Sequence, residues 1–267
     1  MLRLLKIESI KLFYDKTFWM LLSLYALIFV PLCFMLNKLS NTIFGYNAQQ
    51  VQLLVEEKAS YSIFNHPDVW YNITFLSTWF NTLLVIVIII AITNDFHYKT
   101  LKQNIIDGMS KWEVILAKEL VMLTISIFGV VFNIALVLTL GKDVKEVSFF
   151  EGSSILLAYF LAMMLYMNIA YFLSFWFKKS GLVLIVLLLY SWVIENIISY
   201  YLPENISPFL PIDLVSNMIP NPLKALLDTD NTSTNLSLMN ISLCIAYIAL
   251  FISLNYRMLK KGVAAKE

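Results

Sequence analysis

Glu195 is the side chain best placed to do chemistry, because it is an ionisable group within a long apolar stretch, in the sequence YSWVIENIISYY. It lies about fourteen residues into that stretch, and at about 1.5 Å per residue this is some 21 Å along a helix. An ionisable group at such depth in a bilayer generally marks a substrate or proton path. The following Asn196, Tyr200 and Pro203 favour an alternative, in which the helix ends early and Glu195 is wet.

The cysteine and histidine residues do not indicate a catalytic or metal site. Cys33 and Cys244 lie inside apolar stretches, where cysteine usually acts as a small buried hydrophobic residue. His66 and His97 fall on opposite sides of the membrane in the topology derived below, so they could not share a metal ion. No H-x-E or C-x-x-C spacing occurs. We therefore expect no metal site.

Nucleotide and peptide-bond chemistry are not indicated either. The motif G-x-x-x-x-G-K-[ST] is absent and the chain has 7 glycines, so the sequence offers no phosphate-binding loop. Glu56 and Glu57 form an acidic pair, but a membrane protease would need histidines and an arginine at the same depth. We expect that the chain is not an enzyme, holds no cofactor of its own and, since its basic residues are ordinary topogenic charge, binds no nucleic acid.

The elements that must position these residues are transmembrane helices. Hydrophobic residues make up 60% of the 267 residues and charged residues 14%, which is too apolar for a soluble domain. Six stretches are each long enough to cross a hydrocarbon core of roughly 30 Å. They cover about 18–36, 74–93, 120–140, 153–177, 181–202 and 236–255. The sequence predicts an all-α membrane protein of six transmembrane helices, folded as one domain.

The lysines and arginines orient these helices. With both termini on the cytoplasmic side, fourteen of the 19 basic residues fall inside and five outside, as the positive-inside rule requires. The first stretch lacks a small-x-small cleavage site and contains Pro31, so we expect a retained helix and not a signal peptide. The sequence predicts a multi-pass protein of the cell membrane, and its basic C-terminal tail could contact anionic lipid.

The polar loop 94–119 has internal structure. Leu101, Ile105 and Ile106 recur at helical spacing, which predicts a short helix from about Thr100 to Asp107. Gly108 can adopt the left-handed conformation that ends a helix. Ser110 and Glu113 then form an S-x-x-E capping box for the next helix. The loop therefore presents a short, rigidly held helix to the cytosol, with Leu101 expected on its apolar docking face.

The remaining connections also carry predictions. Residues 1–16 alternate charged and apolar positions, which favours an interfacial helix acting either as a lever or as a plain topogenic start. Ala48, Val51, Val55 and Ala59 share one face of a possible outer helix. The four-residue link 178–181 should make the flanking helices neighbours. The proline-rich segment 202–236 should form short helices at the outer leaflet.

The loop and the six-span layout together resemble the ABC-2 type permeases, membrane subunits of bacterial ATP-binding cassette exporters that include antibiotic and bacteriocin-immunity transporters. Their second-to-third loop commonly has an acidic residue, Gly-Thr, an apolar turn, Gly-x-Ser-Arg and a Lys opening the third helix. The residues here are Asp95, Lys99-Thr100, Leu101 with Ile105-Ile106, Gly108-Met109-Ser110-Lys111, and Lys118. Lys99 replaces the usual Gly, and Lys111 the usual Arg.

The resemblance implies an ABC-2 (type V exporter-like) permease fold in which this loop is the coupling helix. It would dock in a groove of a separate ATPase subunit, which binds the ATP and Mg. The implied coupling residues are Asp95, Thr100, Leu101, Ile105, Gly108, Ser110, Lys111 and Glu113. Two permease subunits, identical or paralogous, would form the path for an amphipathic, peptide or lipid-like substrate.

Few residues within the spans indicate a substrate path. The candidates are Glu195, Asn133 and Asn168, although buried amides more often join helices than bind ligands. Two alternatives stay open at this point. The chain could be a proton-coupled secondary carrier that uses Glu195, or a non-transporting immunity or anchor protein of the membrane.

Overall fold

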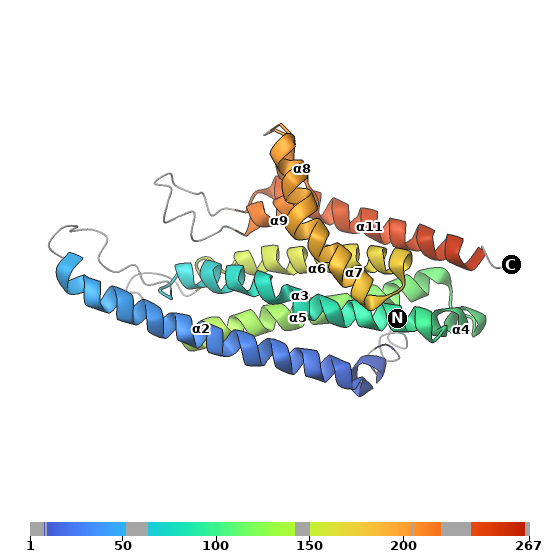
Figure 1. The fold of residues 1–267 in the computed structure, drawn as a ribbon, viewed down its shortest axis with the longest axis horizontal. Helices are drawn as coiled ribbons and strands as arrows, with labels where there is room; N and C mark the ends of the chain where they lie inside the picture. The colour runs from blue at the N-terminus through green and yellow to red at the C-terminus, as the bar shows by residue number, and fades with distance from the viewer. Residues whose placement is uncertain are drawn as a thin grey trace.

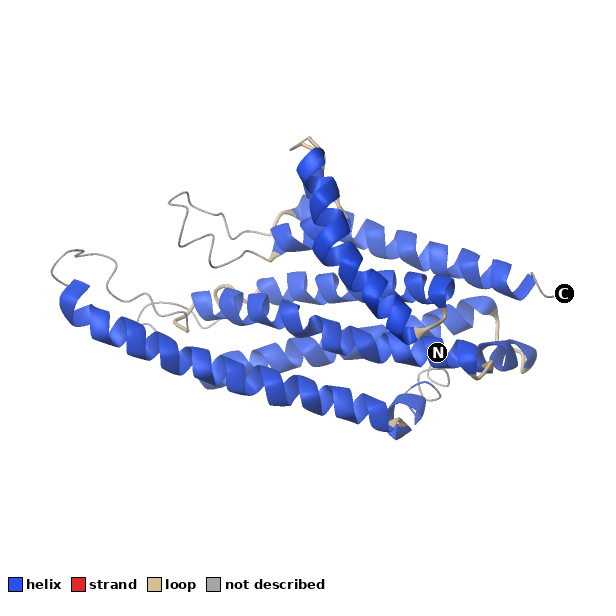
Figure 2. Cartoon of the chain, in the orientation of Figure 1, coloured by secondary structure: helices blue, strands red, loops and turns tan. Residues whose placement is uncertain are grey.

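The computed structural model describes residues 8, 10–51, 64–141, 150–203, 205–219 and 236–264. Its elements are helices, as Figure 2 shows. They are α2 (Lys16–Val51), α3 (Asp68–His97), α4 (Thr100–Ile106), α5 (Lys111–Leu140), α6 (Ile155–Phe177), α7 (Ser180–Leu189), the π-helical turn η1 (Tyr190–Ile194), α8 (Glu195–Tyr201), the 3-10 turn η2 (Ser207–Phe209), α9 (Pro211–Met218) and α11 (Leu238–Ala264). Six helical segments of this described part are long and apolar enough to cross a membrane, which confirms the predicted class.

The spanning helices form one elongated bundle. Helices α2, α3, α5, α6 and α11 run along the long axis of the molecule (Figure 1). Helix α6 lies among them and packs against α3, α5, α7 and α11. It buries Tyr159, Leu165 and Tyr171 completely. Helices α7 and α8 continue through η1 as a single rod, which crosses the bundle obliquely and projects beyond it (Figure 1).

Several helices extend beyond the predicted apolar stretches. Helix α3 begins at Asp68, before the expected residue 74, and α5 begins at Lys111, before residue 120. Each of these helices has 30 residues. At about 1.5 Å per residue each is about 45 Å long, which exceeds a hydrocarbon core of roughly 30 Å. Their polar ends can stay helical outside the apolar core because backbone hydrogen bonds within the helix persist there.

The first spanning helix differs most from the expectation. Helix α2 continues to Val51, so Ala48 and Val51 belong to it and not to a separate outer helix. Between Leu36 and Val51 the sequence contains no proline that would end the helix. Pro31 lies inside α2 without ending it. The other half of the predicted outer helix, residues 55–59, lies outside the described residues.

Short helices follow α8, as the proline-rich sequence predicts. Pro211 takes the first position of α9, where a backbone N–H has no helical partner to lose. Leu214 and Met218 are buried, so α9 packs its apolar side against the bundle. Its neighbours are α6, α8 and α11. The rest of the predicted outer segment, residues 220–235, lies outside the described part of the chain.

Residues 10–14, α4 and the C-terminal end of α11 lie at the same end of the bundle (Figure 1). Asp15 breaks the first short helix, and its Oδ1 accepts a hydrogen bond of 2.9 Å from the backbone N–H of Thr17 in α2. Trp112 of α5 stacks on Tyr256 of α11 with ring centroids 4.8 Å apart. One end of the molecule therefore collects the segments that the basic residues predict to be cytoplasmic.

Candidate functional site

Helix α4 is held between two sharp backbone turns. Lys99, just before it, is left-handed with φ 57° and ψ 17°, and Gly108, just after it, has φ +95°. Ser110 Oγ accepts from the Glu113 N–H at 3.2 Å, and Glu113 Oε2 accepts from the Ser110 N–H at 2.8 Å. These contacts confirm the predicted capping box and the sequence of short helix, tight break and new helix.

The exposed face of α4 differs from the expectation. Leu101 is only 5% exposed, so it packs against the bundle and does not lie on an outward docking face. Ile105 is half-buried and packs on the same core. Ile106 is 77% exposed and is the apolar side chain that α4 presents outward. The positions along the helix explain the difference. Leu101 and Ile105 are four residues apart and therefore lie on the same face, which packs on the bundle, whereas Ile106 points away from that face.

A buried ionic network joins the start of α4 to three other segments. Lys118 Nζ on α5 lies 2.7 Å from Glu8 Oε2 and also pairs with Asp95 Oδ2 at the end of α3. Lys11 Nζ lies 3.2 Å from Glu8 Oε1 and 3.7 Å from Asp95 Oδ1. Thr100, the first residue of α4, donates its hydroxyl to Asp95 Oδ1 at 2.5 Å. Asp95 therefore ties α4 to α5 and to the N-terminal segment.

The network is stable because its buried charges have opposite partners. The side chains of Lys118, Glu8 and Asp95 are exposed by only 5%, 7% and 9%. A lone charge buried to this extent costs several kcal/mol, whereas a paired and hydrogen-bonded one is tolerated. A displacement of α4 would act directly on these ion pairs, so α4 and the adjoining ends of α3 and α5 should move together.

Sequence reasoning assigned a site role to Asp95 and Thr100 but missed Glu8, Lys11 and Lys118 as their partners. Glu8 and Lys118 are 110 residues apart in the chain, and no local spacing relates them. The sequence contains two weak indications of these partners. Charged residues alternate with apolar ones in residues 1–16, and a lysine lies early in the third predicted spanning helix. Of the other coupling residues, Lys111 is the first residue of α5 and is half-buried.

Glu195 is buried, and the alternative of a wet helix end is wrong. The residue is 1% exposed, and the helix continues beyond it to Tyr201. Glu195 Oε1 accepts a hydrogen bond of 3.0 Å from the Asp213 backbone N–H and a second from the Ile212 N–H. These are the first free N–H groups of α9, so the carboxylate caps that helix from another segment. The preceding π-helical turn η1 shifts the helical phase just before the carboxylate.

Substitutions of Glu195 should separate its acceptor role from its charge. Glu195→Leu leaves two backbone N–H groups of α9 without a partner, at about 1–3 kcal/mol for each group that stays buried. Glu195→Gln retains the acceptor oxygen and should destabilise the protein much less. Thermal unfolding of the purified variants in detergent measures the difference. Equal stability of the Leu variant and the wild type would show that the carboxylate does not hold α9.

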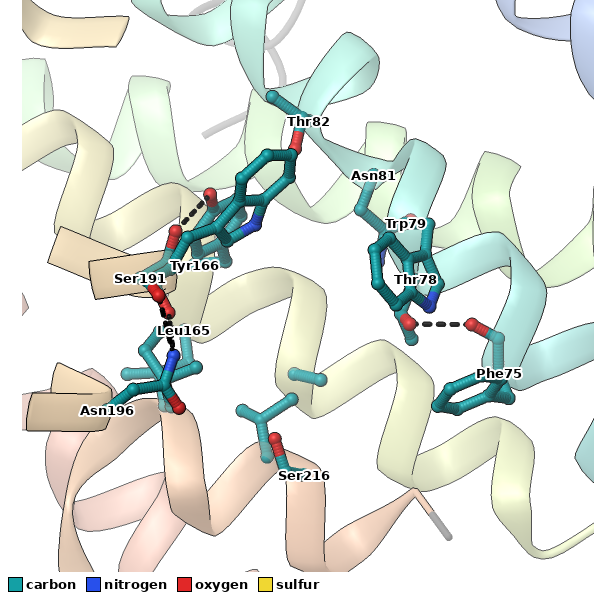
Figure 3. A pocket seen from close by; sticks show the side chains of 14 residues that line it. Phe75, Thr78, Trp79, Asn81, Thr82, Leu165, Tyr166, Ser191, Asn196 and Ser216 are labelled. Carbon is teal, nitrogen blue, oxygen red and sulfur yellow. Dashed lines mark hydrogen bonds between the residues drawn. The ribbon is translucent and has the colours of Figure 1, made fainter. Parts of the chain in front are cut away.

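A cavity of about 320 Å³ lies beside Glu195, between α3, α6, η1, α8 and α9. The cavity is lined by neutral polar side chains, aromatic rings and aliphatic side chains (Figure 3). The lining contains no Asp, Glu, Lys or Arg. The lining residues are Phe75, Thr78, Trp79, Asn81, Thr82, Ala162, Leu165, Tyr166, Ser191, Trp192, Asn196, Ile212, Val215 and Ser216. Such a lining suits a ligand that is apolar over most of its surface and carries uncharged hydrogen-bonding groups.

Polar side chains of the cavity hold one another in place. The Tyr166 and Ser191 hydroxyl oxygens are 3.3 Å apart, and Asn196 Nδ2 donates to the Trp192 carbonyl oxygen at 2.8 Å. Trp79 and Trp192 lie on facing helices with ring centroids 6.5 Å apart, and both are more than half exposed. The cavity therefore has a fixed polar wall on the α6 and η1 side and a pair of accessible indole rings.

The three residues predicted for a substrate path do not meet in this cavity. Asn133 is fully buried, and its Nδ2 donates to the Gly129 carbonyl oxygen of the same helix at 2.8 Å. Asn168 is also fully buried and contacts Glu119 of α5. Both amides therefore join or stabilise helices, as is usual inside membranes. The Thr, Ser and Trp side chains of the cavity were missed because these residue types are common in membrane helices and their alignment depends on helix packing.

Two comparisons with known proteins do not assign the chain to a family. No known family model matches the sequence, and a search of curated proteins gives no significant match. Among the described residues, no group of three or more His, Cys, Asp or Glu could hold a metal ion. The cysteines Cys33 and Cys244 are free and buried. The candidate site therefore has two parts, which are helix α4 with its ionic network and the neutral cavity, and they share no residue.

Proposed function

We propose that this chain is the membrane subunit of an ABC-2 type exporter that works with a separate ATPase subunit. The observation that carries the proposal is the geometry of α4. It is a short helix at the end of the bundle, fixed by left-handed turns on both sides and by a capping box. Its buried face holds it to the bundle, while Ile106, Lys102 and Gln103 are exposed. A rigid, exposed helix of this kind could bind a partner protein and be displaced by a conformational change of that partner.

Energy would enter through this contact, because ATP and Mg would be bound by the partner. The Lys and Arg distribution supports a cytosolic position for α4, on the side of the membrane where ATP is available to an ATPase. Closure of the ATPase would displace α4, and the link from Thr100 to Asp95 and Lys118 would carry the displacement to α3 and α5. This is a two-state switch of rigid elements. Helix α3 also lines the neutral cavity, so the same movement would reshape it.

The uncharged lining of the cavity supports an amphipathic or lipid-like substrate, and the part of the substrate that enters the cavity would carry no net charge. A peptide or a lipid would satisfy this description if its amide, hydroxyl or ester groups met Thr78, Thr82 and Ser191. Two copies of the chain, or the chain and a paralogue, would form the complete path in the cell membrane. Glu195 supports a secondary carrier less well, since its carboxylate is occupied by the N-terminus of α9.

Co-expression with a candidate ABC ATPase, sought among the neighbouring genes, tests the proposal. The ATPase should remain bound to the purified permease in detergent, and its ATP turnover in lipid vesicles should depend on the permease. The control is the same ATPase with a membrane protein of similar size. Retention by the permease alone supports the proposal. If the permease neither retains the ATPase nor changes its ATP turnover, the proposal is wrong.

A further inference from the structure

The carboxylate of Glu119 is buried on α5 without a cationic partner among the described residues. The residue is 8% exposed, and its Oε2 accepts a hydrogen bond of 3.1 Å from Asn168 Nδ2 on α6. The ion pairs of the adjacent network involve Lys118 and Lys11 but not Glu119. At about 1.5 Å per residue, Glu119 lies about 13 Å along α5 from its Ser110 cap, near the inner end of the span. Sequence reasoning missed this group because the apolar stretch was taken to begin at the next residue.

The side chains of Glu119 and Asn168 have more buried acceptor atoms than donors to satisfy them. Glu119 Oε1 and Asn168 Oδ1 are both buried and have no hydrogen-bond partner. Both atoms can only accept hydrogen bonds, because neither an ionised carboxylate oxygen nor an amide carbonyl oxygen carries a proton. The Asn168 amide nitrogen already donates to Glu119 Oε2 and to the Met164 carbonyl oxygen, each at 3.1 Å. Leaving buried acceptors unpaired costs about 1–3 kcal/mol each, and a single proton on the carboxyl would supply the missing donor.

The charges around Glu119 also favour an added positive charge. The adjacent network contains the carboxylates of Glu8 and Asp95 and the ammonium groups of Lys11 and Lys118. With Glu119 ionised, three carboxylates face two ammonium groups, and the excess negative charge is costly in a medium of low dielectric constant. With Glu119 protonated, the charges balance.

The other elements packed on this site do not supply the missing charge. On α6, Tyr171 is fully buried within electrostatic range of Glu119, Asp95 and Glu8, and its hydroxyl makes no hydrogen bond. On α11, which contacts α5 and α6, the cationic side chains of Arg257 and Lys260 are exposed. Glu119 therefore has no compensating cation on any described neighbour.

We propose that Glu119 and Asn168 form a binding site for one proton at the inner end of the bundle. A hydronium ion in the aqueous phase gives up the proton, so one O–H bond breaks in that ion, a water molecule is left behind, and one O–H bond forms at Glu119 Oε1. The acid donates to Asn168 Oδ1 while Asn168 Nδ2 donates to Glu119 Oε2, so the side chains pair as a carboxylic acid and an amide. The proton balances the charge beside the Lys118 network. This site does not depend on an ATPase partner, and it can be tested on the permease alone.

Infrared spectroscopy of the purified permease in lipid vesicles tests the site. At neutral pH the wild type should show a carboxylic-acid C=O band from Glu119, because a glutamate in water is normally ionised at that pH and gives no such band. Glu119→Gln should lose this band, and it should fold because glutamine reproduces both hydrogen bonds of the protonated acid. Glu151→Gln and Glu195→Gln are matched controls, and both should retain the Glu119 band. Asn168→Ala should also retain it but move it to higher frequency, because the C=O group loses its donor.

The outcomes separate a proton from other occupants. A band that is lost in Glu119→Gln and shifted in Asn168→Ala supports the proton site, and the Asn168→Ala shift still decides the matter if Glu119→Gln does not fold. A band that is unchanged in these two variants contradicts it. A wild type without the band, stabilised against heat by sodium chloride but not by choline chloride, would show that a metal cation occupies the site and would overturn the proposal.

Discussion

Replacing Lys118 by Met should destabilise the protein by about 3–5 kcal/mol, because removing one partner of a buried ionic network leaves uncompensated charges. Glu8 and Asp95 would then share only Lys11, whose side chain is 37% exposed and whose distance to Asp95 Oδ1 is 3.7 Å. The mutation replaces an ammonium group by an apolar group of similar length, so the main change is electrostatic. Thermal or denaturant unfolding in detergent measures the loss.

A matched control and a compensating variant isolate the cause. Lys111→Met makes the same change at the first residue of α5, which takes part in none of the described ion pairs, and should have little effect. Adding Glu8→Gln and Asp95→Asn to Lys118→Met removes the stranded carboxylates and should recover a large part of the lost stability. If Lys118→Met were as stable as Lys111→Met, the network would not hold the N-terminal segment to the bundle.

Under the proposed function, replacing Ile106 by Asp should abolish most of the response of the ATPase subunit while leaving this chain folded. Ile106 is 77% exposed, so the aspartate stays in water and costs the folded permease little. In a docked complex the same carboxylate would be buried at an apolar contact, and the loss of a central hot-spot contact costs about 2 kcal/mol or more, which is roughly thirtyfold in affinity. ATPase retention and ATP turnover in vesicles measure the effect.

Two further variants show whether the direction of α4 matters. Gly108→Val adds no clash, since no atom lies within 4 Å of the new Cβ, but it strains a backbone with φ +95° by about 1–2 kcal/mol. It should misdirect α4 and reduce coupling without removing the exposed surface. Leu238→Asp makes the same kind of change at the first residue of α11, which is 83% exposed, and should leave ATPase binding intact. Loss of binding in Leu238→Asp as well would point to general damage.

The sequence predicted the parts of the structure that local residues determine. Gly108, Ser110 and Glu113 lie within six consecutive residues, and each acts on its immediate neighbours, so the helix break and the capping box could be recognised without a structure. The six spanning helices could be predicted because each apolar stretch is long enough to cross a membrane and is unfavourable in water. The direction in which Leu101 points could not be recognised in the same way, because it depends on how α4 rests on α3 and α5.

Long-range partners were not predictable from the sequence. Glu195 was expected near a helix end because Asn196 and Pro203 follow it, but its partners are backbone groups 17 and 18 residues further along. Glu8 meets Lys118 across 110 residues. In both cases a charged group is stable inside the bundle because a segment distant in the sequence packs beside it. The periodicity of the sequence does not indicate such a long-range contact.

Site-specific crosslinking tests most directly whether α4 is the surface that meets the ATPase. The native cysteines Cys33 and Cys244 are buried, so a single cysteine introduced at Ile106 can be labelled selectively with a short thiol crosslinker. Tyr200→Cys, on the projecting helix α8, is an equally exposed control. In membranes containing both subunits, Ile106→Cys should crosslink to the ATPase and Tyr200→Cys should not. An intact complex in which Ile106→Cys gives no crosslink would contradict the assignment of α4 as the docking helix.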